Sequence, residues 1–322
     1  MPAIECRNLT KYYGDVRGVE DVSFTVGDGE VFGFLGPNGA GKTTAIRTLL
    51  GFLSPTSGGG TLLGHDATDP VASRRARERI GFLPGDPGLD RDRTAEAFLD
   101  HQAALRGEAS REQLVDRFGL DESRRIADLS RGNRQKVALV AAFMHDPDLL
   151  LLDEPTSGLD PLLQEEFASL VRERVDDGAS VLLSSHVLGE VAALCDRVGV
   201  LREGRLVAVE SVSDLRSRGG KQVRVRVAED VERADFEVRG TMNLRVGETV
   251  SFTWTGGYDA LIDLLSNYTV MDLDVVDAPL EEAFMTFYDG DVPGPTGDGG
   301  GGATRGGGAS RGAAADAGGD AR

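Results

Sequence analysis

The sequence predicts an α/β domain in which helices pack on a mostly parallel sheet, and three short apolar runs carry this prediction. The runs are residues 31–35 (VFGFL), 149–152 (LLLL) and 181–186 (VLLSSH). Short continuous apolar runs are typical of strands that are buried on both faces. Residues 164–175 (QEEFASLVRERV), between the last two runs, have the apolar spacing of an amphipathic helix. Strands that alternate with helices favour a parallel sheet, whose functional residues gather at the carboxyl ends of the strands.

A glycine-rich loop follows the first strand. Residues 36–43 (GPNGAGKT) fit the pattern G-x-x-x-x-G-K-[ST], and apolar residues at helical spacing follow them. Glycines let the backbone wrap around phosphate oxygens, while successive N–H groups and a helix N-terminus attract an anion. Lys42 can reach the β and γ phosphates, and the Thr43 hydroxyl can bind Mg²⁺. The predicted nucleotide-binding residues here are Gly36, Pro37, Asn38, Gly39, Ala40, Gly41, Lys42, Thr43 and Thr44.

Polar residues also follow the other two strands. Asp153 can hold Mg²⁺ through water, and Glu154 can orient the attacking water or accept its proton. Two adjacent carboxylates usually mark a solvated turn, but the four leucines before this pair place it at a buried strand end. A lone histidine is more often structural than catalytic. His186 ends a strand predicted to neighbour the others, where its imidazole can bond the γ-phosphate or the water beside Glu154.

The chain changes in character near residue 216. Before it, residues 198–209 predict a hairpin that turns at Glu203-Gly204; after it, residues 216–222 (RSRGGKQ) are typical of a linker. Residues 223–227 alternate like a half-buried strand, and helical segments are expected at 258–265 and 279–288. The predicted divisions are a domain at 1–216, a small α+β domain at 217–290 and a Gly/Ala-rich tail at 291–322. The tail can bury too little apolar surface to offset its ordering entropy, so we expect it to be disordered.

Composition excludes several other classes of protein. The net charge of −18 argues against a nucleic-acid partner, which needs clustered Lys and Arg. Cys6 and Cys195 have no metal-ligand spacing and fit two ordinary thiols in a reducing cytoplasm. No charged leader with an apolar run opens the sequence, so no signal peptide is expected. The apolar runs fall far short of the roughly 20 residues that a membrane helix needs, so other subunits must span any membrane involved.

The order of the motifs points to a known family. In sequence they are the loop at 36–43, LSRGN at 129–133, LLLLDEP at 149–155, SGLD at 157–160 and His186. Over about residues 3–215 the chain resembles the nucleotide-binding subunit of an ATP-binding cassette (ABC) transporter. The resemblance implies a P-loop NTPase fold of the ABC type, with a helical subdomain, that binds ATP with Mg²⁺ and hydrolyses it.

The resemblance also implies a site shared by two subunits. In this family two cassettes pair head to tail, so Ser130 and Gly132 would offer a hydroxyl and an N–H group to the γ-phosphate held by the other subunit. The helix expected from Arg131 to about His145 would direct its positive end to the same place, and Asp160 would lie at the same dimer seam. Tyr13 matches the aromatic residue that stacks on adenine, although an ordinary core or surface tyrosine is the alternative.

The chain departs from the family at three positions. Gly85 stands where the family usually has a glutamine that touches Mg²⁺ and relays closure to the membrane subunit. Either Asp86 substitutes for it through water or the metal keeps another water. The motif LSRGN at 129–133 corresponds to the signature motif of the family, and Arg131 and Asn133 replace its usual glycine and glutamine. Neither change removes the two phosphate-facing groups. The segment from residue 87 to about 107 is still expected to face the permease.

The resemblance implies two kinds of protein partner. One is an integral-membrane permease, which this subunit would serve from the cytoplasmic face of the cell membrane. The other is a second ABC ATPase subunit, in a homodimer or a heterodimer. Residues 278–288 (APLEEAFMTFY) are similar to the corresponding segment of ABC-2 exporter cassettes, which favours export over import.

Two alternative functions have different sequence requirements. A non-transport ABC ATPase that acts on ribosomes usually carries two cassettes in one chain, and one that acts on DNA carries a long coiled-coil insertion. This chain has a single cassette, a short gap between loop and signature, and an acidic composition. A degenerate regulatory ATP-binder would not need the intact Lys42, Asp153, Glu154 and His186. The sequence therefore favours a transport ATPase.

Overall fold

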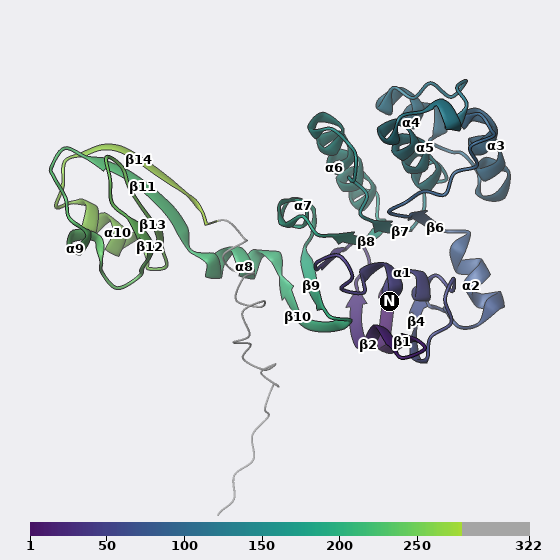
Figure 1. Cartoon of the computed structure of the whole chain (residues 1–322), viewed down its shortest axis with the longest axis horizontal. Coiled ribbons are helices and arrows are strands. Elements are labelled where there is room, and N and C mark those ends of the chain that lie inside the picture. The colour runs from purple at the N-terminus through teal and green to yellow at the C-terminus, as the bar shows by residue number, and fades with distance from the viewer. Residues whose placement is uncertain (279–322) are drawn as a thin grey trace, which may run out of the picture. The chain divides into compact units, whose positions relative to one another are not determined.

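The computed structural model describes residues 1–278, apart from the side chains of residues 217–219. Three sheets organise these residues (Figure 1). The helix expected at 279–288 and the tail expected at 291–322 lie outside the described residues, so both stay predictions, as do the domain limits at 216 and 290.

The largest sheet confirms the mostly parallel α/β prediction. Its strand order is β10 (Arg205–Ser211), β9 (Arg197–Arg202), β3 (Val31–Leu35), β8 (Ser180–Ser185), β7 (Leu149–Asp153) and β6 (Ile80–Leu83). All neighbours are parallel except β10, which returns antiparallel to β9 in the predicted hairpin. Because β3, β8 and β7 are adjacent and parallel, the polar residues that follow them share one edge of the sheet.

A second, antiparallel sheet was not predicted from the sequence. Its order is β2 (Val16–Val26), β1 (Ile4–Tyr13), β4 (Ser57–Leu62) and β5 (His65–Asp66). It packs on the large sheet through a cluster of aromatic rings, in which the Phe24 centroid lies 5.3 Å from that of Phe32 and 4.7 Å from that of Phe34. Helix α1 (Lys42–Leu49) contacts strands of both sheets, and α2 (Pro70–Arg77) follows β5. This packing fixes the end of β1 near the glycine-rich loop.

A group of helices forms the other part of the core. Helices α3 (Ala95–Arg106), α4 (Arg111–Phe118) and α5 (Arg131–Phe143) lie side by side, with a short 3₁₀ turn at Ile126–Asp128 (Figure 1). Helices α6 (Pro161–Asp176) and α7 (Leu188–Leu194) pack against the sheet, and Phe143 meets Phe167 edge to face at 6.4 Å. Helix α6 begins three residues earlier than predicted, because Asp160 caps it and proline suits the first helical position.

The third sheet has a hydrophobic core of its own. Helix α8 (Val212–Gly219) leads to strands in the order β12 (Thr241–Arg245), β13 (Val250–Trp254), β11 (Lys221–Val227) and β14 (Val270–Asp277), with helices α9 (Arg233–Phe236) and α10 (Tyr258–Leu265). Phe236, Phe252 and Trp254 are buried in its core. The predicted linker at 216–222 is wrong, since only Gly220 separates α8 from β11. A Cβ at Gly220 would lie 2.5 Å from the Trp254 carbonyl oxygen, so the sharp turn requires glycine.

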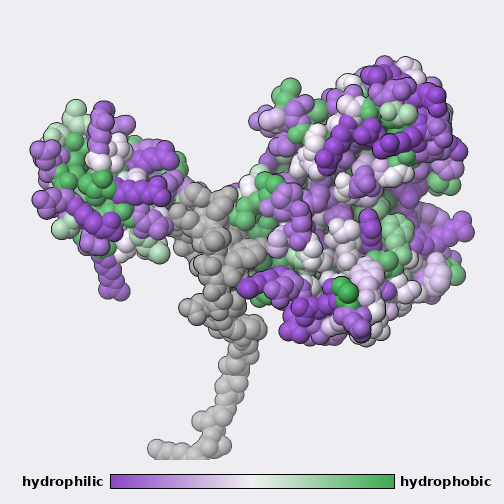
Figure 2. All heavy atoms as spheres, in the orientation of Figure 1, coloured by the Kyte–Doolittle hydropathy of each residue, from purple (hydrophilic) through white to green (hydrophobic). Residues whose placement is uncertain are grey.

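The described residues have a mostly hydrophilic visible surface and two buried cysteines (Figure 2). Hydrophilic residues prevail on the face that Figure 2 shows. Among residues 1–278, no helix combines the length and the hydrophobicity that crossing a bilayer requires. Cys6 and Cys195 are both free and buried. Burial raises the pKa of the Cys6 thiol to about 12 and also raises that of Cys195, which makes both thiols unreactive.

Candidate nucleotide-binding site

The glycine-rich loop joins β3 to α1, and close backbone contacts require glycine at two of its positions, Gly36 and Gly41. A Cβ at Gly36 would lie 2.4 Å from the Leu201 carbonyl oxygen, and a Cβ at Gly41 would lie 2.6 Å from the Gly18 carbonyl oxygen. Gly41 also has φ +106°, a conformation that side chains disfavour. The loop can therefore wrap tightly enough for its N–H groups to approach a ligand.

Lys42 lies inside this loop. Its side chain is only 5% exposed, and Nζ donates a hydrogen bond of 2.6 Å to the Gly36 carbonyl oxygen. The same Nζ lies 3.1 Å from Oε1 of Glu154. The Lys42 side chain therefore lies between the glycine-rich loop and the Glu154 carboxylate.

Two predicted metal ligands meet at the edge of the sheet. Asp153 is buried, and its Oδ2 accepts a hydrogen bond of 2.8 Å from the Thr43 hydroxyl. Its Oδ1 accepts a hydrogen bond of 2.5 Å from Ser184, the residue paired with it on the neighbouring strand. Hydroxyl and carboxylate oxygens are the donors that Mg²⁺ prefers. The chemistry of this donor set therefore fits the expected ion, which Thr43 and Asp153 would hold.

Ser184 was not predicted, because a serine in an apolar strand gives no local signal of its contact with Asp153. Its contact orients the carboxylate, so we expect Ser184→Ala to raise the Mg²⁺ concentration for half-maximal ATPase activity roughly tenfold. A Mg²⁺ titration at saturating ATP measures the change. Ser180→Ala, at the other end of the same strand, is the control. An unchanged titration midpoint would contradict the orienting role.

Glu154 and His186 are also brought together as predicted. Nδ1 of His186 lies 2.5 Å from Oε2 of Glu154, whose other carboxylate oxygen faces Lys42. Glu154 has φ 51°, and its N–H donates to the Ser184 carbonyl oxygen at 3.0 Å. A non-glycine residue in this left-handed conformation is uncommon and typical of functional sites. The backbone therefore aims the carboxylate between a cation and an imidazole, beside the glycine-rich loop.

A further carboxylate near this pair escaped the sequence analysis. Glu190 lies in the first turn of α7 and accepts a hydrogen bond of 2.5 Å from the Ser185 hydroxyl. Burial raises the pKa of Glu190, and hydrogen bonds from Ser185 and Thr156 oppose this shift. A charged residue in the first turn of a short helix is ordinary, so no sequence pattern distinguished it.

A cavity of about 290 Å³ lies over the loop. Its wall includes Tyr13, residues 37–44 and Glu154, whereas Gly36, which was predicted with them, does not line it. Tyr13 is 47% exposed, and Nζ of Lys11 lies 5.3 Å from the centroid of its ring. An exposed aromatic residue in the cavity wall is suited to stacking on a base. Val16, Arg17 and Gly18 also line the cavity but were not predicted; they follow Tyr13 in the β1–β2 hairpin, and this proximity was the one signal that could have found them.

The remaining predicted residues do not line this cavity in the described part of the subunit. Ser130 and Asp160 are exposed helix caps: Oγ of Ser130 accepts from the Asn133 N–H at 3.2 Å, and Oδ1 of Asp160 accepts from the Leu163 N–H at 3.0 Å. Gly132 is half-buried in the first turn of α5. The cavity of one chain therefore contains the glycine-rich loop and Glu154 but not Ser130 or Gly132 of the same chain.

Gly85 lies beside the carboxylates. A Cβ at this position would lie 3.2 Å from the Asp153 carbonyl oxygen and 3.7 Å from Cβ of Glu154. Glycine therefore leaves no side chain next to these two carboxylates. Gly85 and Asp86 both line a hollow that also includes Arg131 and Arg134. That Asp86 takes over the role of the family's glutamine through a water molecule stays a prediction.

Comparisons with known proteins agree with this geometry. Residues 19–157 match the family model described as ABC transporter. The chain is 38% identical over 245 residues to the daunorubicin/doxorubicin resistance ATP-binding protein DrrA of Streptomyces peucetius, and the match covers 73% of each chain. It is also 33% identical to a solved ATP-binding subunit of an ABC transporter, with a TM-score of 0.62, over 66% of this chain and 92% of that chain.

A longer relative matches over part of its length. The probable multidrug ABC transporter ATP-binding protein YbhF of Escherichia coli is 39% identical over 223 residues, which cover 67% of this chain but 38% of that protein. The family-model match at residues 19–157 contains the glycine-rich loop together with Asp153 and Glu154. The chain belongs to the ABC transporter family, as an ATP-binding cassette.

Proposed function

We propose that this chain is the ATP-binding and ATP-hydrolysing subunit of an ABC transporter and powers a separate membrane permease, in the direction of export. The observation that carries the proposal is the meeting of Lys42, Glu154 and His186 beside the Thr43–Asp153 pair. These groups come from three adjacent strand ends and supply a phosphate-binding cation, a metal site and a base.

Each group has a separate task in hydrolysis. The loop N–H groups and Lys42 bind the β and γ phosphates, and Tyr13 stacks on adenine. Thr43 and Asp153 would hold Mg²⁺, which would supply positive charge next to the phosphate oxygens. Glu154 orients the attacking water and receives its proton, while His186 holds the carboxylate in place.

The other half of the site comes from a second subunit. Ser130 and Gly132 lie at the N-terminus of the 13-residue helix α5, where a hydroxyl and free N–H groups favour an anion. They would contact the γ-phosphate held by the partner, and Asp160 would lie at the same seam. ATP then closes the dimer, and its hydrolysis to ADP and phosphate reopens it.

The partners follow from the same proposal. DrrA is named for resistance to two drugs and YbhF for multidrug transport, which supports export by this chain as well. The permease spans the membrane, and this subunit binds it peripherally at the cytoplasmic face. Action on ribosomes or DNA is the alternative.

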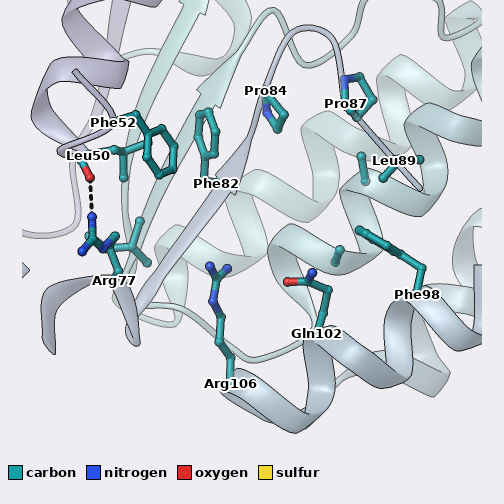
Figure 3. Close-up of a pocket in the computed structure, with 14 residues that line it drawn as sticks. Leu50, Phe52, Arg77, Phe82, Pro84, Pro87, Leu89, Phe98, Gln102 and Arg106 are labelled. Atoms are coloured by element: carbon teal, nitrogen blue, oxygen red, sulfur yellow. Dashed lines mark hydrogen bonds between the residues drawn. The ribbon is translucent and has the colours of Figure 1, made fainter. Parts of the chain in front are cut away.

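A groove, distinct from the cavity over the glycine-rich loop, is the docking site that we assign to the permease. It is a cavity of about 280 Å³ between the end of α1, the loop after β6 and helix α3 (Figure 3). Phe52 and Phe82 form one wall, with ring centroids 5.6 Å apart, while Phe98 and Arg106 point into the cavity from α3. The lining residues Leu89, Phe98 and Arg106 belong to the segment at 87–107 that was expected to face the permease.

Charge in this groove gives a prediction. Among the described lining residues Arg77 and Arg106 carry positive charge and none is acidic. Arg106→Glu should reduce permease-stimulated ATPase activity at least tenfold, because a like charge opposes the carboxylate that this groove would take from the permease. Basal activity of the isolated subunit should stay unchanged. Arg75→Glu, on α2 and outside the groove lining, is the matched control; equal loss in both variants would contradict docking here.

Reconstitution tests the function as a whole. ATP turnover should rise when the subunit is mixed with vesicles that contain its permease, and should not respond to ribosomes or double-stranded DNA. Stimulation by either of the latter, with none by the permease, would favour the non-transport alternative. No turnover under any condition would favour a regulatory ATP-binder.

A further inference from the structure

The first turn of α5 is joined to the segment that follows Glu154, defined here as the carboxylate loop (residues 154–160). Nη2 of Arg131 donates a hydrogen bond of 2.9 Å to the Ser157 hydroxyl. One turn further along the helix, Nε2 of the buried Gln135 donates a hydrogen bond of 2.9 Å to the Pro155 carbonyl oxygen. Two side chains of α5 thus bind the carboxylate loop at two places, Ser157 and Pro155.

Close packing reinforces these bonds. Gly158 has φ +83°, and a Cβ there would lie 3.3 Å from Nε and 3.4 Å from Cδ of Arg131. A Cβ at Gly132 would lie 3.2 Å from the Gly158 carbonyl oxygen. The arginine therefore lies across the backbone of the carboxylate loop, and the absence of side chains at both glycines permits this approach.

The carboxylate loop is short and internally bonded. The Ser157 N–H donates to the Glu154 carbonyl oxygen at 3.2 Å, and the Leu159 N–H donates to the Thr156 carbonyl oxygen at 3.0 Å. A displacement of Ser157 therefore acts on the backbone of Glu154 through one hydrogen-bonded turn. The carboxylate of Glu154 in turn contacts Lys42 and His186.

Gly85 makes this connection more important. It lies beside Asp153 and Glu154 and has no side chain with which to link them to the helices. Arg131 and Asp86 line the same hollow between the loop that contains Gly85 and α5. Arg131 thus contacts the carboxylate loop at Ser157, from the side of α5.

We propose that Arg131 is a positioning residue, which couples the signature turn of each subunit to the Glu154 of that same subunit. The inference rests on the proposed two-subunit site. When Ser130 and Gly132 bind the nucleotide of the partner, the first turn of α5 and the carboxylate loop shift together. The carboxylate of one site is thereby aligned by closure on the other site, so the two ATP molecules are hydrolysed cooperatively.

Arg131→Ala and Ser157→Ala test this coupling in the full chain. Each should lower kcat roughly tenfold to a hundredfold, because small misplacements of a catalytic group have effects of this size. The Hill coefficient for ATP should fall toward 1, while the KM for ATP should change little. The double variant should be no slower than the worse single variant, because each substitution removes the same hydrogen bond between Arg131 and Ser157. Arg131→Lys, which keeps a donor, should recover part of kcat, and Arg91→Ala is the matched control from the same hollow.

ATP-dependent dimerisation separates this inference from the proposed function. In a Glu154→Gln background, Arg131→Ala should still dimerise with ATP and Mg²⁺. Loss of dimerisation through Arg131→Ala alone would overturn the inference, because Arg131 would then act on the partner directly. Unchanged kcat and cooperativity in a subunit that dimerises would also overturn it. Failure of Glu154→Gln itself to dimerise would instead contradict the proposed two-subunit site.

Discussion

Replacing Glu154 with glutamine will leave ATP binding intact and lower the rate of hydrolysis by about a hundredfold to ten-thousandfold, the usual range for loss of a general base. Glutamine keeps the size of the side chain but cannot accept the proton of the attacking water. The amide also removes the negative charge that faces Lys42 at 3.1 Å. Because ATP is bound but not consumed, the closed dimer should accumulate.

Two measurements check this prediction. Single-turnover hydrolysis gives the rate of the chemical step, and light scattering with ATP and Mg²⁺ gives the mass of the complex. Glu165→Gln, the same change in α6 and outside the cavity lining, is the matched control and should behave as the unmodified chain does. A Glu154→Gln variant that hydrolyses ATP at the normal rate would contradict the role of the carboxylate.

Replacing Lys42 with alanine should weaken ATP binding roughly a hundredfold, since truncating one partner of a buried charge pair commonly has effects of this size. The substitution removes the ammonium from the centre of the glycine-rich loop. It also removes the Lys42 ammonium from the Gly36 carbonyl oxygen and from Oε1 of Glu154. The affinity for ATP should therefore fall far more than the affinity for adenosine.

Isothermal titration with ATP and with adenosine measures both affinities. Lys42→Met separates charge from volume, because methionine fills a similar space without a charge, and it should lose as much ATP affinity as alanine does. Thermal unfolding of both variants shows whether the fold persists. Equal ATP affinity in the variant and the unmodified chain would refute the contact with phosphate.

The parallel sheet and the loop side of the site could be predicted because both depend on local sequence. Residues 149–152 are uniformly apolar, as a strand buried on both faces must be, and the loop at 36–43 needs glycines that no other residue replaces. Their position at one sheet edge then followed from topology, since parallel strands present their carboxyl ends together.

Other parts of the structure depend on contacts that no local pattern reveals. Strands β1 and β2 pair with several register shifts, so their apolar residues do not alternate regularly and the antiparallel sheet was missed. Ser184 acquires its role through its cross-strand pairing with Asp153. The link from Arg131 to Ser157 joins residues that are 26 positions apart, and the sequence showed only that an arginine replaced a glycine.

Mixing two inactive variants tests most directly whether ATP is held by one subunit and completed by another. Lys42→Ala lacks a working loop and Gly132→Glu lacks a working signature, so each alone should be inactive. A mixed dimer contains one site with both halves intact, so random pairing should restore at most about a quarter of normal ATPase activity. The proposed coupling lowers this recovery further, because the other site of the mixed dimer cannot close. If mixed dimers form, as shown by differently tagged subunits that co-purify, and activity still does not exceed the sum of the two variants, the two-subunit site is contradicted.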